Sequence, residues 1–133
     1  MTSKNPERLK VQILLVDDDP LIRSLGRELL EKLGYGVETA EKGEEVLEKF
    51  QQGRFPDLVI LDYHLPGMSG LEVCRQLKSL DPGVKMLVAS GFFSDLQITQ
   101  LKAEGAVGFL HKPFRLRELQ CLIEEVLQES SEN

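Results

Sequence analysis

The sequence predicts an α/β fold: a doubly wound sheet of five parallel strands with helices on both faces. Short apolar runs alternate with longer amphipathic segments along the whole chain, which indicates a repeated strand–helix unit. The run at 58–61 is apolar throughout, as expected of a strand buried on both faces. Parallel strands need crossover connections, and these are right-handed, so such repeats predict an open parallel sheet.

The elements follow from this pattern in order. Strands are expected at 11–16, 36–39, 58–61, 85–89 and 107–110, and helices at 21–33, 44–52, 69–80, 95–104 and 115–128. Asp19 before Pro20 is a favourable start for the first helix, because a capping carboxylate precedes a residue that needs no N–H partner. The apolar residues expected on one face of this helix are Ile22, Leu25, Leu29 and Leu33. The helix at 95–104 has few apolar residues, so we expect it to be loosely held.

Length, charge and cysteine spacing limit the classes of protein to which this chain can belong. A chain of 133 residues suits one domain, which we place at 11–128 between a polar N-terminal extension at 1–10 and a polar tail at 129–133. The net charge of −6 offers no broad basic field, so direct binding to nucleic acid is not expected. An export signal and a membrane span are not indicated, and Cys74 and Cys121 lack metal-site spacing. We therefore expect a cytoplasmic protein with reduced cysteines and no membrane partner.

Polar residues stand where four of the strands end. Asp17 and Asp18 follow the first strand, Asp62 the third, Ser90 the fourth and Lys112 the fifth. Singly, each has an ordinary explanation as a helix entrance, a turn residue, a loop hydroxyl or a surface cation. In parallel sheets, however, ligands bind outside the carboxyl ends of the strands, where these residues are expected to converge.

Together these residues suit phosphoryl chemistry. Three carboxylates are hard oxygen ligands for a cation of the size of Mg²⁺, and a lysine and a hydroxyl can bind phosphoryl oxygens. Asp62 is then the candidate nucleophile, because it stands alone at the end of the central apolar strand.

Four segments resemble the motifs of the receiver domains of two-component response regulators. They are "LLVDDDP", "LVILDYHLPGMSGLEV", "MLVASGF" and "GFLHKPF", in that order and at strand ends. The resemblance covers 11–128 and implies a flavodoxin-like three-layer (βα)5 sandwich with strand order 2-1-3-4-5. It also implies a phosphorylation-dependent switch that catalyses its own phosphoryl transfer and slow autodephosphorylation, not an enzyme with a separate substrate.

The resemblance implies a role for each site residue. Asp62 would accept a phosphoryl group from a phosphohistidine of a sensor histidine kinase or histidine phosphotransfer protein. Asp18 and Asp62 would contact Mg²⁺ directly, Asp17 through water, and the backbone carbonyl of His64 would complete the ligands; Mn²⁺ is expected to be able to replace Mg²⁺. Ser90 and Lys112 would bind phosphoryl oxygens in the active state.

The resemblance also implies how the signal leaves the site. Phe109 would be the aromatic switch, turning inward as Ser90 moves, and the bond from Lys112 to Pro113 would be cis. Because almost nothing follows the last helix, we expect a stand-alone receiver whose output is contact with a downstream protein effector. The surface expected to make that contact is formed by the helix at 95–104, the last strand and the last helix.

Some positions depart from the family or are open to two interpretations. Ser90 stands where a threonine is common, and the loop of Gly91, Phe92 and Phe93 is not transferred in detail. The side chain of His64 is expected at the mouth of the site. His111 should point away from Lys112 and be structural, because neighbouring residues of a strand face opposite ways.

Two other functions remain open to comparison. One is a metal-dependent phosphohydrolase with an aspartate nucleophile. Members of that class are expected to have a second aspartate two residues after the nucleophile, and this chain has His64 there. They are also expected to have a cap domain, for which a chain of 133 residues leaves no room. The other is a scaffold with a degenerate site, which is disfavoured because every expected site residue is present.

Overall fold

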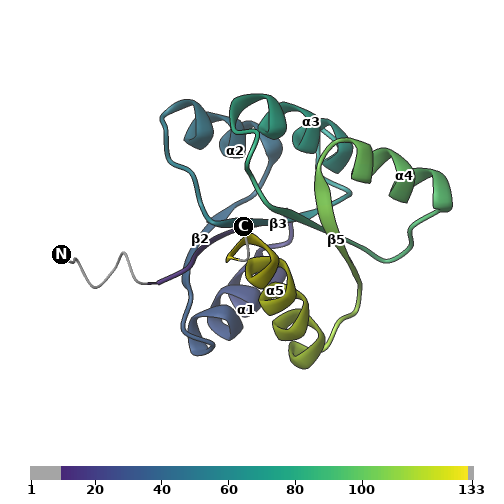
Figure 1. The fold of residues 1–133 in the computed structure, drawn as a ribbon. Helices are drawn as coiled ribbons and strands as arrows, with labels where there is room; N and C mark the ends of the chain where they lie inside the picture. The colour runs from purple at the N-terminus through teal and green to yellow at the C-terminus, as the bar shows by residue number, and fades with distance from the viewer. Residues whose placement is uncertain (1–9, 132–133) are drawn as a thin grey trace.

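The computed structural model describes residues 10–131 as one parallel sheet with helices on both faces (Figure 1). The strands lie in the order β2-β1-β3-β4-β5, which confirms the predicted fold class and strand order. The strands are β1 (Gln12–Val16), β2 (Gly36–Ala40), β3 (Leu58–Asp62), β4 (Met86–Ser90) and β5 (Ala106–His111). The helices are α1 (Pro20–Lys32), α2 (Gly43–Gln51), α3 (Gly70–Leu80), α4 (Asp95–Ala103) and α5 (Leu116–Ser131).

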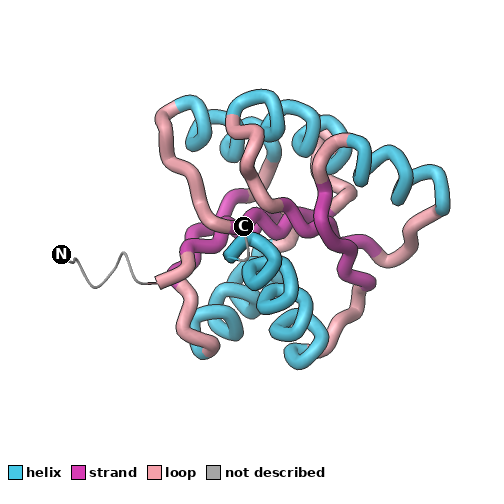
Figure 2. Tube along the Cα trace, in the orientation of Figure 1, coloured by secondary structure: helices cyan, strands magenta, loops and turns pink. Residues whose placement is uncertain are grey.

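The sheet is the middle of three layers. Helices α2, α3 and α4 cover one face, and α1 and α5 cover the other (Figures 1 and 2). Each face has its own apolar cluster: Val46, Leu77 and Leu101 belong to the first, and Leu30 and Ile123 to the second. The middle strand β3 is buried along its whole length, as the sequence predicts. Its last residue, Asp62, therefore lies at the carboxyl end of the central strand, between the ends of β1 and β4.

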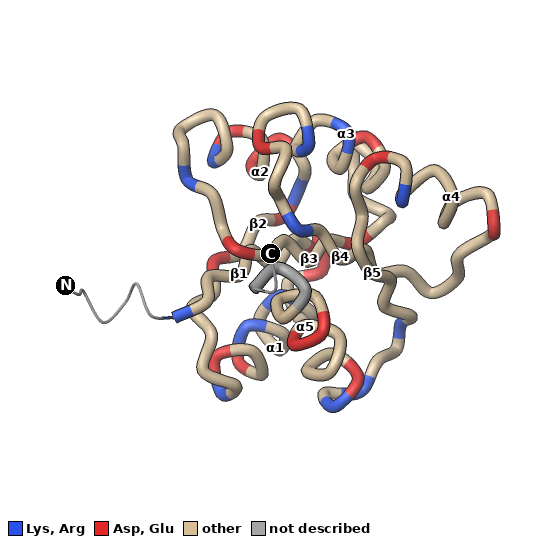
Figure 3. The backbone as a smooth tube through the Cα atoms, viewed as in Figure 1, with Lys and Arg blue, Asp and Glu red and all other residues tan. Residues whose placement is uncertain are grey.

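The ends of the chain differ in part from the prediction. Helix α5 continues to Ser131, past the expected end at Gln128, so the expected tail begins as helix. Residues 1–9 of the expected N-terminal extension and residues 132–133 lie outside the described residues. Within 10–131, every helix is too short or too polar to cross a membrane. Figure 3 shows Lys and Arg scattered among Asp and Glu on the helices.

Helix α1 starts as predicted but turns a different face to the sheet. Asp19 caps it, accepting a 2.9 Å hydrogen bond from the backbone N–H of Leu21. The predicted apolar face is wrong in detail, because Leu25 is 50% exposed whereas Leu30 is fully buried. A side chain at Gly26 would lie 2.7 Å from Leu15, so the helix approaches β1 through this glycine. With Gly26 facing β1, the neighbouring Leu25 is left half exposed.

Helix α4 buries few apolar side chains and has an ion pair just past its C-terminal end. Among its nine residues Leu101 is buried, and Ile98 packs against the core from the side. Arg75 of α3 forms a 3.3 Å ion pair with Glu104, just past the end of α4. That α4 is the loosely held helix concerns motion and stays a prediction.

Candidate phosphoacceptor site

Three carboxylates meet at the carboxyl edge of the sheet. Carboxylate oxygens of Asp17, Asp18 and Asp62 all lie within 4.8 Å of one another. Asp17 and Asp62 are buried, and Asp18 is exposed. Parallel pairing of β1 with β3 brings the two strand ends side by side, so the convergence predicted from the sequence is present.

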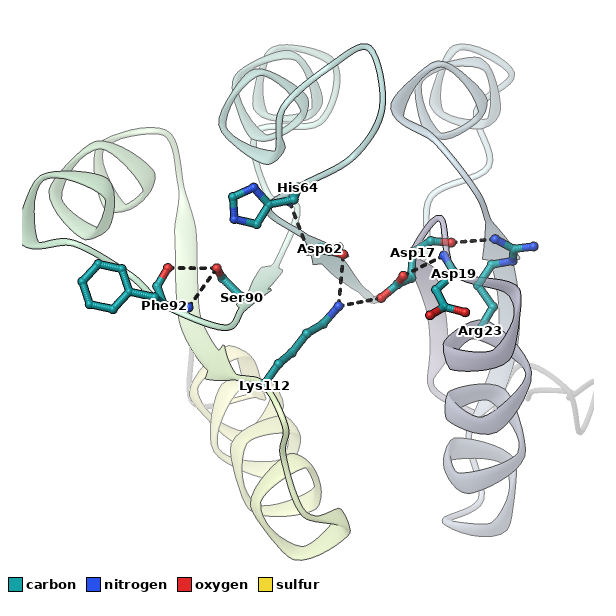
Figure 4. Close-up of polar contacts among 8 residues, drawn as sticks. All are labelled: Asp17, Asp19, Arg23, Asp62, His64, Ser90, Phe92 and Lys112. Carbon is teal, nitrogen blue, oxygen red and sulfur yellow. Dashed lines mark hydrogen bonds and ion pairs between the residues drawn. The ribbon is translucent and has the colours of Figure 1, made fainter.

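Lys112 joins the two buried carboxylates (Figure 4). Its Nζ donates to Asp17 Oδ2 at 2.9 Å and to Asp62 Oδ2 at 3.0 Å. The side chains of Asp17 and Asp62 are 5% and 10% exposed, and that of Lys112 is 27% exposed. Partial burial lowers the pKa of Lys112, but the hydrogen bonds to both aspartates outweigh it, so the pKa is raised overall. The lysine therefore stays charged and offsets part of the repulsion between the carboxylates.

The three consecutive aspartates are compatible because each has a different environment. Asp17 points inward, where its Oδ1 accepts a 3.0 Å bond from the N–H of Asp19 and its Oδ2 accepts from Lys112. Asp18 faces solvent, and Asp19 caps α1. The carboxylates thus diverge from one short segment, and two of them have polar partners.

Arg23 is a site residue that the sequence analysis did not find. Its Nη1 donates to the backbone carbonyl of Asp17 at 2.7 Å, as Figure 4 shows. The contact reaches back from α1 to the end of β1 and fixes the carbonyl next to the buried carboxylate. An arginine within the first turns of a helix that follows a strand-end acid was the available signal.

The segment after Asp62 folds tightly against the strand end. The N–H of His64 donates to Asp62 Oδ1 at 3.1 Å, so both carboxylate oxygens of Asp62 have partners. The N–H of Gly70 bonds the carbonyl of Tyr63 at 2.8 Å, and a side chain at Gly70 would lie 2.8 Å from Tyr63 Cα. The imidazole of His64 is exposed and packs edge-on against the ring of Tyr63, away from the carboxylates.

Ser90 ends β4 beside Asp62, but its hydroxyl is bonded elsewhere. Strand pairing sets Asp62 opposite Ala89, the residue before Ser90. The Ser90 hydroxyl donates to the carbonyl of Phe92 at 2.9 Å and accepts from the N–H of Phe92 at 3.3 Å. The structure therefore brings Ser90 to the correct edge of the sheet without joining its hydroxyl to the pair of Asp62 and Lys112.

The end of β5 and the residues after it include one feature that the structure confirms, and the switch role of Phe109 stays a prediction. The peptide bond between Lys112 and Pro113 is cis, as expected. Phe109 is half-buried, and its ring lies 5.4 Å from that of Phe93, centroid to centroid. His111 is exposed and packs edge-on against Phe93 at 5.3 Å, a packing contact consistent with the structural role predicted for it.

A buried aspartate at the end of a central parallel strand, flanked by acidic residues and a lysine, fits a phosphoacceptor site. The family model for the response regulator receiver domain matches residues 13–124. The chain therefore belongs to the receiver domains of response regulators of two-component systems, a class of phosphorylation-dependent switches.

Individual relatives agree with this membership. The chain is 39% identical over 123 residues to the response regulator MprA of Mycobacterium sp. strain KMS, covering 92% of this chain and 53% of MprA. It is 35% identical over 117 residues to the sensor kinase CckA of Brucella abortus strain 2308, covering 87% of this chain and 12% of CckA. The chain thus spans about half of the one relative and a small part of the other.

Solved structures show the same architecture. A CheY-like receiver domain protein from Methanospirillum hungatei JF-1 is 33% identical, with a TM-score of 0.87 over 92% of this chain and 98% of that one. The receiver domain of the sensor histidine kinase PA1611 from Pseudomonas aeruginosa PAO1 has a TM-score of 0.80 over 90% and 98% of the chains. That domain was solved with magnesium in its active-site cleft, and at 23% identity the likeness concerns the fold.

Proposed function

We propose that Asp62 is the phosphoacceptor and that it takes its phosphoryl group from a phosphohistidine of a sensor histidine kinase or histidine phosphotransfer protein. The observation that carries the proposal is the position of Asp62: it is buried at the end of β3, bonded to Lys112 at 3.0 Å, and within 4.8 Å of the Asp17 and Asp18 carboxylates. A structural aspartate would need one partner, whereas this site places a cation and two further carboxylates around it.

The transfer forms one bond and breaks another. A carboxylate oxygen of Asp62 attacks phosphorus, and the bond from phosphorus to the donor imidazole nitrogen breaks. The electron pair of that bond stays on the nitrogen, and the imidazole, protonated on its other nitrogen, leaves neutral. The hydrogen bond from the His64 N–H to Asp62 Oδ1 orients the carboxylate for this attack.

Lys112 and Ser90 stabilise the product. The Lys112 ammonium already lies within hydrogen-bond distance of Asp62, so it can donate to a phosphoryl oxygen added there. The Ser90 hydroxyl supplies a second donor once it leaves Phe92. Slow hydrolysis of the acyl phosphate returns the protein to its resting state.

The acidic cluster fits a divalent cation. Its oxygens belong to carboxylates, the hard ligands that Mg²⁺ prefers, and Asp18 leaves one side open to solvent for the waters that Mg²⁺ retains. Asp18, Asp62 and the carbonyl of His64 would hold the ion directly and Asp17 through water, with Mn²⁺ able to replace Mg²⁺. When bound, the ion supplies positive charge that offsets the negative charge on the phosphoryl oxygens.

The output is a change in the surface formed by α4, β5 and α5, read by a downstream protein effector. Phe109 and His111 lie on β5, which is part of this surface, and Lys112 directly follows His111 in the chain. A change at Lys112 or Ser90 therefore reaches this surface through adjoining residues.

Intact mass after incubation with Mg²⁺ and acetyl phosphate tests the proposal. Wild type should gain one phosphoryl group, and Asp62→Asn and wild type in EDTA should gain none. Asp57→Asn is the matched control, because Asp57 precedes the opposite end of β3 and bonds the N–H of Gln12 at 2.8 Å, far from the site. The control should be labelled like wild type. Full labelling of Asp62→Asn would overturn the assignment.

A further inference from the structure

The loop between β4 and α4 is tied to the Ser90 hydroxyl. The hydroxyl both donates to and accepts from the backbone of Phe92, at 2.9 and 3.3 Å; Figure 4 shows these bonds on the side of Ser90 away from Lys112. Ser90 is 1% exposed, so water does not compete with these bonds. The conformation of the loop thus depends on the hydroxyl of one buried serine.

The next residue, Phe93, connects this loop to β5. Its side chain is 7% exposed, whereas the neighbouring ring of Phe92 is 73% exposed. The Phe93 ring meets Phe109 edge-on at 5.4 Å and His111 at 5.3 Å, with interplanar angles of 74° and 82°. Phe93 is therefore the buried side chain that contacts both of these β5 residues.

We propose that Ser90 and Phe93 form a latch, in which Phe93 is the positioning residue that couples the Ser90 hydroxyl to Phe109 and His111. This inference rests on the proposed function for its trigger, which is phosphorylation of Asp62. If Ser90 acted on Phe109 directly, Phe93 would have no role; the latch instead assigns the coupling between them to Phe93.

The coupling follows from the single proton of a hydroxyl. Ser90 cannot donate to the carbonyl of Phe92 and to a phosphoryl oxygen at once. Donation to the phosphoryl group leaves the Phe92 carbonyl without this partner, so the loop backbone rearranges to satisfy it. Phe93 is one residue further along, and its movement removes the ring edge against which Phe109 and His111 pack.

A first comparison tests the latch without any phosphodonor. Ser90→Ala removes both bonds to Phe92 and should shift the ring NMR resonances of Phe93 and Phe109 in the unmodified protein; these two rings are the reporters, because His111 pairs directly with Ser90 between β4 and β5. Ser90→Thr keeps the hydroxyl and is the matched control, with resonances close to those of wild type. If Ser90→Ala leaves the ring resonances of Phe93 and Phe109 where they are in wild type, the proposed latch is wrong.

A second comparison tests the coupling during phosphorylation. Phe93→Leu keeps an apolar residue but removes the ring, whereas Phe92→Leu makes the same change at the exposed neighbour. Loss of edge-on aromatic contacts changes an equilibrium by about two- to tenfold, so phosphorylation should move His111 correspondingly less in Phe93→Leu. The extent of phosphorylation should match wild type in both variants, and Phe92→Leu should retain the full His111 response.

The outcomes separate the two proposals. Equal His111 shifts in wild type and Phe93→Leu would exclude Phe93 as the coupling residue even if Asp62 is phosphorylated. Failure of wild type to gain a phosphoryl group would overturn the proposed function, and the Ser90 comparison would still decide the latch. Phe93→Met, whose unbranched side chain adapts to irregular space, gives the same readout if Phe93→Leu does not fold.

Discussion

Replacing Lys112 by methionine removes the charge that Asp17 and Asp62 share while keeping a long apolar stem. Removing one partner of a buried ion pair lowers the free energy of unfolding by about 3–5 kcal/mol, because the charge of the other partner is left uncompensated. Lys112 is 27% exposed, which lets water screen the pair, so we expect a loss of about 2–3 kcal/mol in EDTA. For a domain of this size the melting temperature should fall by about 6–15 °C.

Mg²⁺ should reverse much of this loss. Three carboxylates and one ammonium leave two negative charges in wild type, and Lys112→Met leaves three. A divalent cation therefore gains more attraction, and loses a competitor, in the variant. The gain in melting temperature between EDTA and excess Mg²⁺ should be larger in Lys112→Met than in wild type.

Thermal unfolding followed by circular dichroism measures both effects. Lys32→Met is the control, because the Lys32 ammonium lies 4.0 Å from Glu28 on the exposed surface of α1. This variant should stay within about 0.5 kcal/mol of wild type. If Lys112→Met and the control have the same melting temperature in EDTA, the lysine does not compensate the buried carboxylates and the reasoning is refuted.

Three further predictions concern the metal, the cysteines and the loop after Asp62. At a concentration ten times its dissociation constant, Mg²⁺ should stabilise wild type by about 1.4 kcal/mol. Asp18→Asn should have a higher melting temperature than wild type in EDTA and gain less from Mg²⁺. Unchanged melting temperatures would exclude a metal site. A thiol reagent should label exposed Cys121 but not Cys74 in the native protein, because burial, with a contribution from Glu104, raises the pKa of Cys74 to about 12. Since the thiol of the unfolded chain ionises near its ordinary pKa of 9.0, the stability of wild type relative to Cys74→Ala should fall as the pH rises from 9.0 toward about 12; a constant difference would count against it. Gly70→Ala should destabilise by about 1–3 kcal/mol in denaturant melts, because its side chain would press on Tyr63, and an effect no larger than that of Gly91→Ala, where space is open, would contradict this.

The fold was predictable because its signals are local. The all-apolar run at 58–61 identifies a strand buried on both faces, and the alternation around it fixes the parallel sheet. The gathering of Asp17, Asp62 and Lys112 follows from that sheet, since carboxyl ends of parallel strands share one edge whatever the side chains are.

The partners of the site residues were not predictable in the same way. Whether Lys112 reaches Asp17 as well as Asp62 depends on the distance between strand ends, and whether Ser90 bonds Phe92 depends on a rotamer and a loop conformation. The face of α1 depends on the close approach at Gly26, which a pattern of apolar residues does not contain. The sequence therefore indicated that Asp17, Asp62 and Lys112 meet, and the structure added which of their atoms bond, the contact of Arg23 with Asp17, and the bonding of Ser90 to Phe92.

The most direct test of the account is to locate the phosphoryl group. Borohydride reduces an aspartyl phosphate to the alcohol, so phosphorylation with acetyl phosphate and Mg²⁺, reduction and peptide mass mapping identify the acceptor. The account predicts that the reduced residue is Asp62, and that omission of Mg²⁺ abolishes the modification. A reduced residue at Asp17 or Asp18, or a phosphate on Ser90 with Asp62 unmodified, would contradict it.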